Sequence, residues 1–176
     1  LVPTVALAAD TTSVTVDGTS VVGNSTTYYK NKGYTGGLKN GNANDYNVKY
    51  EPDTHTLTLN NYQGSSIYSN DYLTINVEGQ DNKIKNIEYS NNAILVYDNL
   101  TITGTGRLES EASQNRSTIY VAKNLTINGG VTLIVPGGSS GQSIHAVGGS
   151  IVISGSNTVV RATKGYSQGV VRSGSS

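Results

Sequence analysis

One stretch of the chain recurs along it: residues 93–108, with the sequence Ala-Ile-Leu-Val-Tyr-Asp-Asn-Leu-Thr-Ile-Thr-Gly-Thr-Gly-Arg-Leu. The same skeleton returns from Thr118 to Leu133, as Thr-Ile-Tyr-Val-Ala-Lys-Asn-Leu-Thr-Ile-Asn-Gly-Gly-Val-Thr-Leu. Related repeats begin at Ser66 and Ser143. Self-similarity at a fixed period is the signature of repeat architectures. The sequence therefore predicts a solenoid.

Three apolar columns and one glycine column keep nearly the same spacing along the chain. The first apolar column runs through Ile67, Ile94, Ile119, Ile144 and Val170. The second runs through Leu73, Leu100, Leu125 and Ile151, and the third through Ile84, Leu108, Leu133 and Val159. The glycines follow at Gly79, Gly104, Gly129 and Gly155. The columns drift together by only a residue or two, as expected for repeats that each build the same unit.

The local pattern within each repeat predicts three short strands. Leu-Thr-Ile and Ile-Tyr-Val alternate apolar and polar residues, which is typical of half-buried strands, and clusters of Gly, Asn and Ser bound them. Three strands in about 25 residues favour one coil of an all-β, right-handed parallel β-helix; a β-sandwich with evenly spaced strands is the alternative. Equivalent residues of successive coils would stack about 4.8 Å apart, with Asn99 and Asn124 forming an amide ladder at a turn.

The composition argues against several classes of function. Twelve basic and twelve acidic residues cancel, whereas a nucleic-acid-binding protein would show a basic face, and no polybasic run indicates a membrane surface. The absence of cysteine excludes disulfides, thiolate metal sites and cysteine nucleophiles. The two histidines, His55 and His145, lie in no catalytic or metal-binding motif. We therefore expect no enzyme, no nucleic-acid partner and no membrane insertion.

The chain before the repeats is expected to contain a leader and a cap. Residues 1–9 are apolar with small residues in an Ala-x-Ala arrangement, which is typical of the end of a secretory signal; if they are retained, the alternative is a strand that pairs within the domain or with a neighbour. Residues 10–55 are expected to cover the first coil of the repeats, which span 56–176. The cap should contain a hairpin that turns at Asp17-Gly18. It also holds a cluster of tyrosines that are expected to pack in the cap with their hydroxyls at the rim; a sugar-stacking cluster is the alternative. These are Tyr28, Tyr29, Tyr34, Tyr46 and Tyr50.

Residues 45–171 resemble the β-helical carbohydrate-binding domains of Firmicute (clostridial-type) surface proteins. The motifs that carry the resemblance are Tyr-Asn-Val-Lys-Tyr, a Pro-Asp turn and Thr-Leu-Thr-Leu-Asn-Asn, followed by Leu-Thr-Ile and Gly-Thr-Gly-x-Leu coils. The resemblance implies a right-handed parallel β-helix that is secreted, extracellular or attached to the cell surface. It also implies, for some members, binding of acidic plant polysaccharide with calcium, although no calcium ligand of the family can be placed on this chain.

An outward column of side chains is the predicted ligand-binding face. If the isoleucines of the first apolar column point inward, their neighbours Tyr68, Leu95, Tyr120 and His145 point outward, with Tyr97 on the same face. A row of rings at strand spacing suits stacking of pyranose rings or packing of a partner protein. Packing against a loop, or simple β-propensity, is the alternative.

One acidic column is a candidate for calcium. Asp71 and Asp98 occupy the same place before their Leu-Thr-Ile strands, and two carboxylates about 5 Å apart would attract a cation with a preference for oxygen ligands. Lys123 occupies the next coil and offers Asp98 a partner without a metal. The alternative is therefore a solvated turn.

Two functional hypotheses follow. The first is a secreted, non-catalytic carbohydrate-binding protein or adhesin of the cell surface, with calcium as a candidate cofactor. The second is a subunit of an extracellular filament, a homo-oligomer whose coils stack end to end, since an open terminal coil offers unpaired backbone groups to another chain. An outward column of Thr74, Thr101 and Thr126 also permits ice binding, although Val152 interrupts it.

Overall fold

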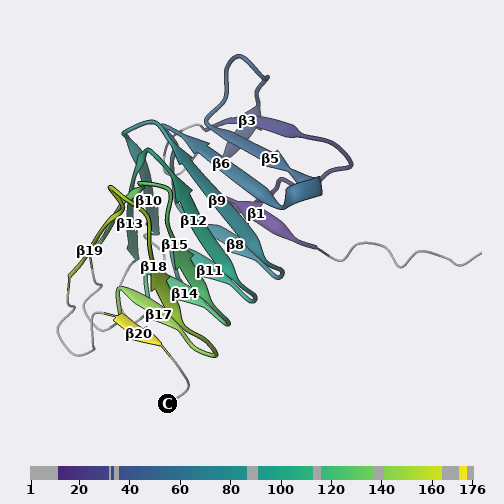
Figure 1. Ribbon diagram of the computed structural model, residues 1–176. Coiled ribbons are helices and arrows are strands. Elements are labelled where there is room, and N and C mark those ends of the chain that lie inside the picture. Colours follow the sequence, from purple (N-terminus) through teal and green to yellow (C-terminus); the bar gives the residue numbers. More distant parts are fainter. Residues whose placement is uncertain are drawn as a thin grey trace, which may run out of the picture.

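The chain forms a β-solenoid of three parallel sheets (Figure 1). The structure, a computed structural model, describes residues 12–31, 33, 36–86, 91–112, 116–136, 141–163 and 171–173. The leader 1–9, Tyr34 and Val170 lie outside this range. The predicted all-β parallel solenoid is confirmed, because equivalent strands of successive coils pair in parallel.

Each coil contributes one strand to each sheet. The first sheet contains β8 (Ile67–Ser69), β11 (Ile94–Val96), β14 (Ile119–Val121), β17 (Ile144–Ala146) and β20 (Val171–Ser173). The second sheet contains β6 (Thr56–Asn60), β9 (Leu73–Glu78), β12 (Leu100–Gly104), β15 (Leu125–Ile127) and β18 (Ile151–Ile153). The third sheet contains β7 (Gln63–Gly64), β10 (Asn82–Asn86), β13 (Arg107–Ala112), β16 (Thr132–Val135) and β19 (Val159–Ala162).

The core lies inside the coils, where identical kinds of side chain stack in register. Ile67, Ile94, Ile119 and Ile144 are Cα partners along the first sheet, and each is at most 1% exposed. The second predicted column is also confirmed, since Leu73, Leu100, Leu125 and Ile151 pair in order along the second sheet. Alternation along each strand sends the intervening residues outward. The hydrophobic effect therefore sets the register, because a slip of one residue would exchange the two faces.

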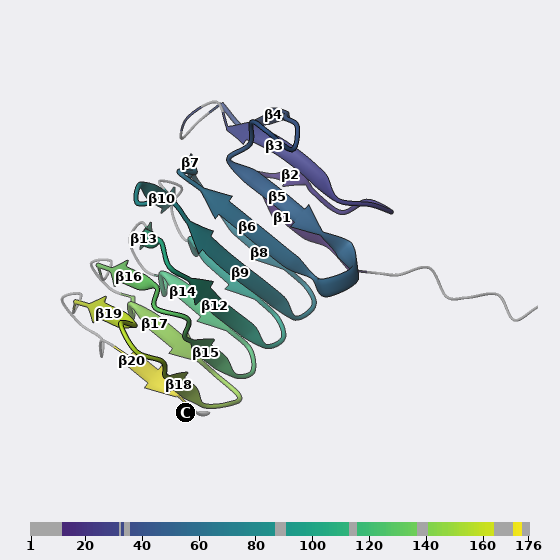
Figure 2. The same cartoon turned by 45° about the horizontal axis from the view of Figure 1, so that its top comes forward.

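Antiparallel strands cover the N-terminal end of the solenoid. β1 (Val14–Val16) and β2 (Thr19–Ser20) form the expected hairpin, with Asp17 and Gly18 both at positive φ, and β1 pairs antiparallel with β8. On the second sheet, β3 (Thr27–Asn31), β4 (Leu38–Asn40) and β5 (Val48–Glu51) extend the pairing beyond β6. A 3-10 turn, η1 (Pro52–Thr54), joins β5 to β6, where parallel pairing begins. The two views show these strands together at one end of the stack (Figure 2).

The cap tyrosines pack partly as expected. Tyr50 is buried and Tyr29 packs against the core. The rings of Tyr28 and Tyr46 lie 5.6 Å apart, and the Tyr46 hydroxyl donates to Glu78 Oε2 at 3.3 Å. These contacts tie the cap to the second sheet.

Three column assignments from the sequence were wrong in register. Val171, and not Val170, pairs with Ile144. In the third sheet Asn82 pairs with Leu108, so Ile84 lies opposite Ser110. At the far end Val160 takes the predicted place of Val159, which instead pairs with Thr132. In each case the spacing between equivalent strands differs from that of the neighbouring coils, so an apolar residue close to the true partner was taken for it.

The last described coil leaves its inner face open. Ile127 is fully buried, whereas its partner in the next coil, Ile153, is 52% exposed. Val160 and Ala162 are partly buried, although their partners Leu133 and Val135 are completely buried. Among the described residues the two ends of the solenoid therefore differ: antiparallel strands cover the first, while the apolar interior of the second faces solvent.

Candidate functional site

The predicted outward column exists in the first sheet. Tyr68, Leu95, Tyr120 and His145 are Cα partners in that order, and all four side chains are half-buried. The Tyr120 and His145 rings meet edge to face at 5.7 Å between centroids. Thr15 of the cap continues the column beyond Tyr68. The column is thus a continuous ridge of outward side chains along the first sheet.

The more exposed rings lie where the first sheet turns into the second. We call the turns 70–72, 97–99 and 122–124, which stack on one another, the aromatic corner. Tyr97 is 52% exposed and packs edge-on against Tyr68, 5.9 Å between centroids. Tyr72 is 44% exposed and lies parallel to the His55 ring at 4.4 Å, with an interplanar angle of 8°. Two large aromatic faces therefore meet solvent at this corner.

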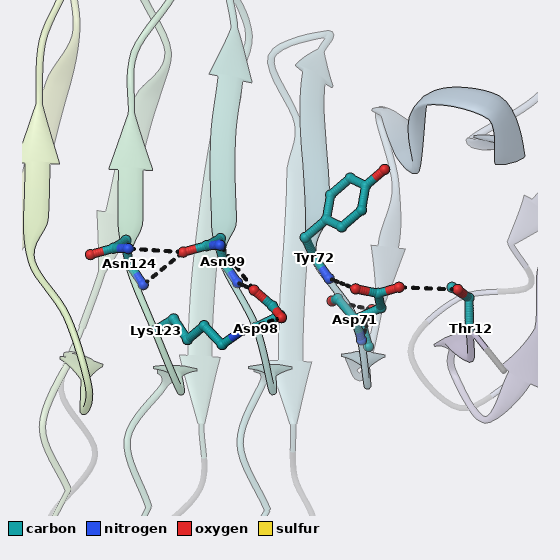
Figure 3. A network of polar contacts seen from close by, with 8 residues as sticks. Thr12, Asp71, Tyr72, Asp98, Asn99, Lys123 and Asn124 are labelled. Atoms are coloured by element: carbon teal, nitrogen blue, oxygen red, sulfur yellow. Dashed lines mark hydrogen bonds and ion pairs between the residues drawn. The ribbon is translucent and has the colours of Figure 1, made fainter. Parts of the chain in front are cut away.

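Asp71 is held by donors of its own chain at the aromatic corner (Figure 3). Its Oδ1 accepts from the Tyr72 backbone N–H at 2.7 Å, and its Oδ2 accepts from the Thr12 hydroxyl at 3.2 Å. The Ser69 hydroxyl donates to the Asp71 carbonyl at 2.8 Å. These bonds attach the start of the cap hairpin to the first corner turn.

Asp98 pairs with Lys123 of the next coil. Lys123 Nζ lies 2.6 Å from Asp98 Oδ2, while the backbone N–H and side-chain amide of Asn99 donate to Oδ1 at 2.6 and 2.9 Å. The hydrogen bond from Lys123 holds the pKa of Asp98 below its usual value, with help from the Asn99 N–H. The pair is largely solvated, so its contribution to stability is small.

The expected amide ladder is confirmed. Asn124 Nδ2 donates to Asn99 Oδ1 at 3.0 Å, and the Ser150 backbone N–H donates to Asn124 Oδ1 at 3.0 Å in the following coil. Figure 3 shows the Asn99–Asn124 step beside the Asp98–Lys123 pair. The ladder fixes the spacing of the corner turns 97–99 and 122–124 and continues to Ser150 of the following coil.

The carboxylates of Asp71 and Asp98, the two calcium candidates, are hydrogen-bonded within the chain. Across the described part of the chain, no group of three or more His, Asp or Glu side chains is placed to hold a metal ion. Asp71 and Asp98 each accept hydrogen bonds from donors of the chain, which a cation at this corner would have to displace. The calcium hypothesis stays a prediction.

Sequence reasoning missed Tyr72 and His55 as parts of the exposed aromatic surface. The local pattern gave a signal for Tyr72, because it occupies the same corner position as Asn99, which was expected at the turn. His55 had no such signal. It adopts a left-handed conformation, φ 48°, after η1, and this turn brings its ring over Tyr72.

What the aromatic corner can do chemically follows from its mixture of groups. Tyrosine rings offer flat apolar faces with a polar hydroxyl, and carboxylate, amide and ammonium groups stand beside them. Such a surface suits a ligand that is apolar on its faces and hydroxylated at its edges.

Within the described residues, no helix is long and apolar enough to cross a membrane.

Comparisons with known proteins leave the family open. No family model, no curated protein and no solved structure matches the chain. The resemblance to carbohydrate-binding domains of Firmicute surface proteins therefore stays a prediction. The chain is identified by its architecture alone, as a parallel β-solenoid whose described residues form one covered and one open end.

Proposed function

We propose that the protein is a secreted, non-catalytic protein of the cell surface that binds carbohydrate at the aromatic corner. The observation that carries this proposal is the exposure of Tyr72 (44%) and Tyr97 (52%) beside the polar groups of Asp98, Asn99 and Lys123. Tyrosine rings present flat apolar faces on which a sugar ring can stack, and each carries a hydroxyl that can hydrogen-bond. The neighbouring carboxylate, amide and ammonium groups supply further hydrogen-bonding partners for the hydroxyl groups of a sugar.

A glycan array tests this function. We expect Tyr97→Ala to weaken binding of neutral or acidic polysaccharides about fivefold, because a lost stacking contact of a ring is of the order of 1 kcal/mol. Thr74→Ala, on the flat outer face of the second sheet, serves as the control. Repeating the array with calcium and with a chelator tests whether a metal takes part. Equal binding by Tyr97→Ala and the unmodified chain would exclude this ring from the site.

A further inference from the structure

The ring of Tyr72 has one covered face and one free face. The His55 ring lies parallel to it, with the centroids 4.4 Å apart and an interplanar angle of 8°. A ring that is stacked on one side can expose only its other face and its edges, so the 44% exposure of Tyr72 places its second face in solvent. Figure 3 shows this side chain extending from the corner turn away from Asn99. We call Tyr72 and His55 the ring pair.

The backbone around His55 fixes the position of its ring. Its N–H donates to the Pro52 carbonyl at 3.2 Å, and its own carbonyl accepts from the Thr74 N–H at 3.0 Å. Between these bonds the residue has a left-handed conformation, with φ 48° and ψ 43°. The histidine is thus attached both to η1 and to β9, the strand that directly follows Tyr72.

Stacking is the contact that the His55 side chain offers to the aromatic corner. Its Nδ1 is buried and has no hydrogen-bond partner among the described residues. A histidine whose role is hydrogen bonding would satisfy this nitrogen, because buried polar atoms normally have partners. The parallel ring contact therefore indicates that His55 supports the Tyr72 ring from below.

Tyr72 is also held from its own side of the ring pair. Its backbone N–H donates to Asp71 Oδ1 at 2.7 Å, and the N–H of Leu73 donates to the Asn99 carbonyl at 3.0 Å. A side chain that is held in place before binding loses little conformational freedom when a ligand stacks on it. The free face of Tyr72 is therefore pre-organised.

The charged side chains closest to the ring pair along the chain are carboxylates. Asp53 lies two residues before the histidine and is exposed, and Asp71 lies directly before the tyrosine. Residues so close in the chain lie within about 7 Å of each other, which is less than the Debye length of about 8 Å at physiological salt. Lys123, the cation of the aromatic corner, is paired with Asp98 at 2.6 Å. A ligand with carboxylates of its own would therefore be repelled at the ring pair.

We propose that the ring pair is a stacking subsite for an uncharged pyranose ring, in which Tyr72 contacts the sugar and His55 is a positioning residue. This inference rests on the proposed carbohydrate binding, and it narrows the ligand to neutral glycans. The sugar lies on the free face of Tyr72, as the third member of a stack that begins with His55. Its C–H groups contact the tyrosine ring, and its hydroxyl groups stay at the edge of the stack.

Substitutions at the ring pair test the role of His55. Asparagine tolerates the left-handed conformation but has no ring, so His55→Asn should weaken glycan binding about two- to tenfold by releasing the Tyr72 side chain. His55→Phe keeps a ring and should bind as the unmodified chain does. In a Tyr72→Ala background, His55→Asn should have no further effect, which a purely structural role of the histidine would not produce. Circular dichroism checks that each variant is folded.

Three outcomes of this series would overturn the positioning role. They are unchanged binding by His55→Asn, equal losses in the Asn and Phe variants, and a loss from His55→Asn that persists in the Tyr72→Ala background.

An array of matched neutral and oxidised polysaccharides tests the charge preference. Glucan, galactan and mannan are printed beside the same polymers oxidised at C6 to carboxylates, and a chelator is present so that calcium cannot bridge two carboxylates. We expect the neutral form of a bound polymer to bind about threefold more tightly, because of repulsion by the nearby carboxylates. The difference should shrink at high salt, which screens this repulsion. Equal or tighter binding of the oxidised form would contradict the proposal.

The proposed function and this inference fail in different ways. Binding to none of the six polymers would overturn carbohydrate binding together with the inference that rests on it. If Tyr97→Ala weakens binding and Tyr72→Ala leaves it unchanged, the aromatic corner still binds carbohydrate and only the subsite at the ring pair is refuted.

Discussion

At the scale of single residues, Tyr62 illustrates how the cap is locked onto the first turn of the solenoid. Its side chain is completely buried, and its hydroxyl and the Asp17 carboxylate of the cap hairpin both stand against Gly64, where a Cβ atom would collide with them. Asp17 Oδ1 in turn accepts from the backbone N–H of Ser65 at 2.5 Å. The glycine is required here because the two polar groups occupy the space of a side chain.

The burial of Tyr62 predicts a loss of stability in alkali. Burial, and secondly the nearby Asp17 charge, raise the pKa of Tyr62 well above 10.0. In the unfolded chain the phenol of Tyr62 ionises near pH 10, whereas in the folded state it keeps its proton. Above pH 10 the free energy of unfolding therefore falls by about 1.4 kcal/mol per pH unit, until the pH reaches the pKa of Tyr62 in the folded state. Tyr62→Phe should remove this component. Urea denaturation of the unmodified chain and of Tyr62→Phe from pH 9 to 11 measures how the free energy of unfolding changes with pH. The difference between the two proteins at pH 6 to 8 is the reference. If both proteins lose stability with the same slope, the loss is not due to Tyr62.

At the scale of the structural element, a buried amide takes the place of an apolar side chain in β10. Asn82 is fully buried at the position that pairs with Leu108. Its Nδ2 donates to the carbonyls of Glu78 at 2.5 Å and Arg107 at 3.1 Å, and its Oδ1 accepts from the Tyr62 N–H at 2.9 Å. The side chain thus satisfies backbone groups of three neighbouring segments.

Asn82→Leu should therefore destabilise the protein although it restores the apolar column. The leucine would remove the three hydrogen bonds of the Asn82 side chain, including the acceptor of the Tyr62 N–H in the core. Because each lost hydrogen bond to a buried group costs about 1 kcal/mol or more, we expect a loss of at least about 2 kcal/mol in the free energy of unfolding. Thr74→Ala, on the outer face, should stay within about 0.5 kcal/mol of the unmodified chain. Chemical denaturation with a common m-value measures both; a leucine variant as stable as the unmodified chain would show that the amide is dispensable.

Apolar core positions of the strands could be predicted from the sequence, whereas a polar core position could not. The Leu73 column, and the Ile94 column as far as Ile144, were predicted correctly because apolar residues recur there without a break. The outward column with Tyr68 followed from alternation. The third column failed at Asn82, because a pattern of apolar residues does not reveal a polar side chain that satisfies backbone groups inside the core. The stacking of His55 on Tyr72 could not be predicted either, because it depends on the left-handed conformation of His55 after η1.

At the scale of the whole molecule, each coil is a unit that pairs with its two neighbours. β11, β12 and β13 pair only with equivalent strands of the coils before and after. In such one-dimensional architectures stability is approximately a sum over repeats and their interfaces. A whole coil should therefore be removable, provided that the register is kept.

Deletion of residues 94–118 tests this modularity. It joins Ala93 to Ile119, which is the Cα partner of Ile94, so every remaining strand keeps its face. We expect a folded protein with the same type of circular dichroism spectrum and reduced stability. Deletion of residues 94–117 shifts the junction by a single position and would turn the first strand after it inside out. If the two deletions unfold at the same denaturant concentration, the coils are not independent modules.

The position of the cap in the chain has a consequence for biogenesis. The strands that close one end of the stack are N-terminal and precede the coils in the order of synthesis. Each later coil pairs with the one completed just before it, so a chain emerging gradually from a ribosome or a translocation pore always finds a finished edge on which to fold. At each stage of synthesis the aggregation-prone edge is therefore only the most recently formed one.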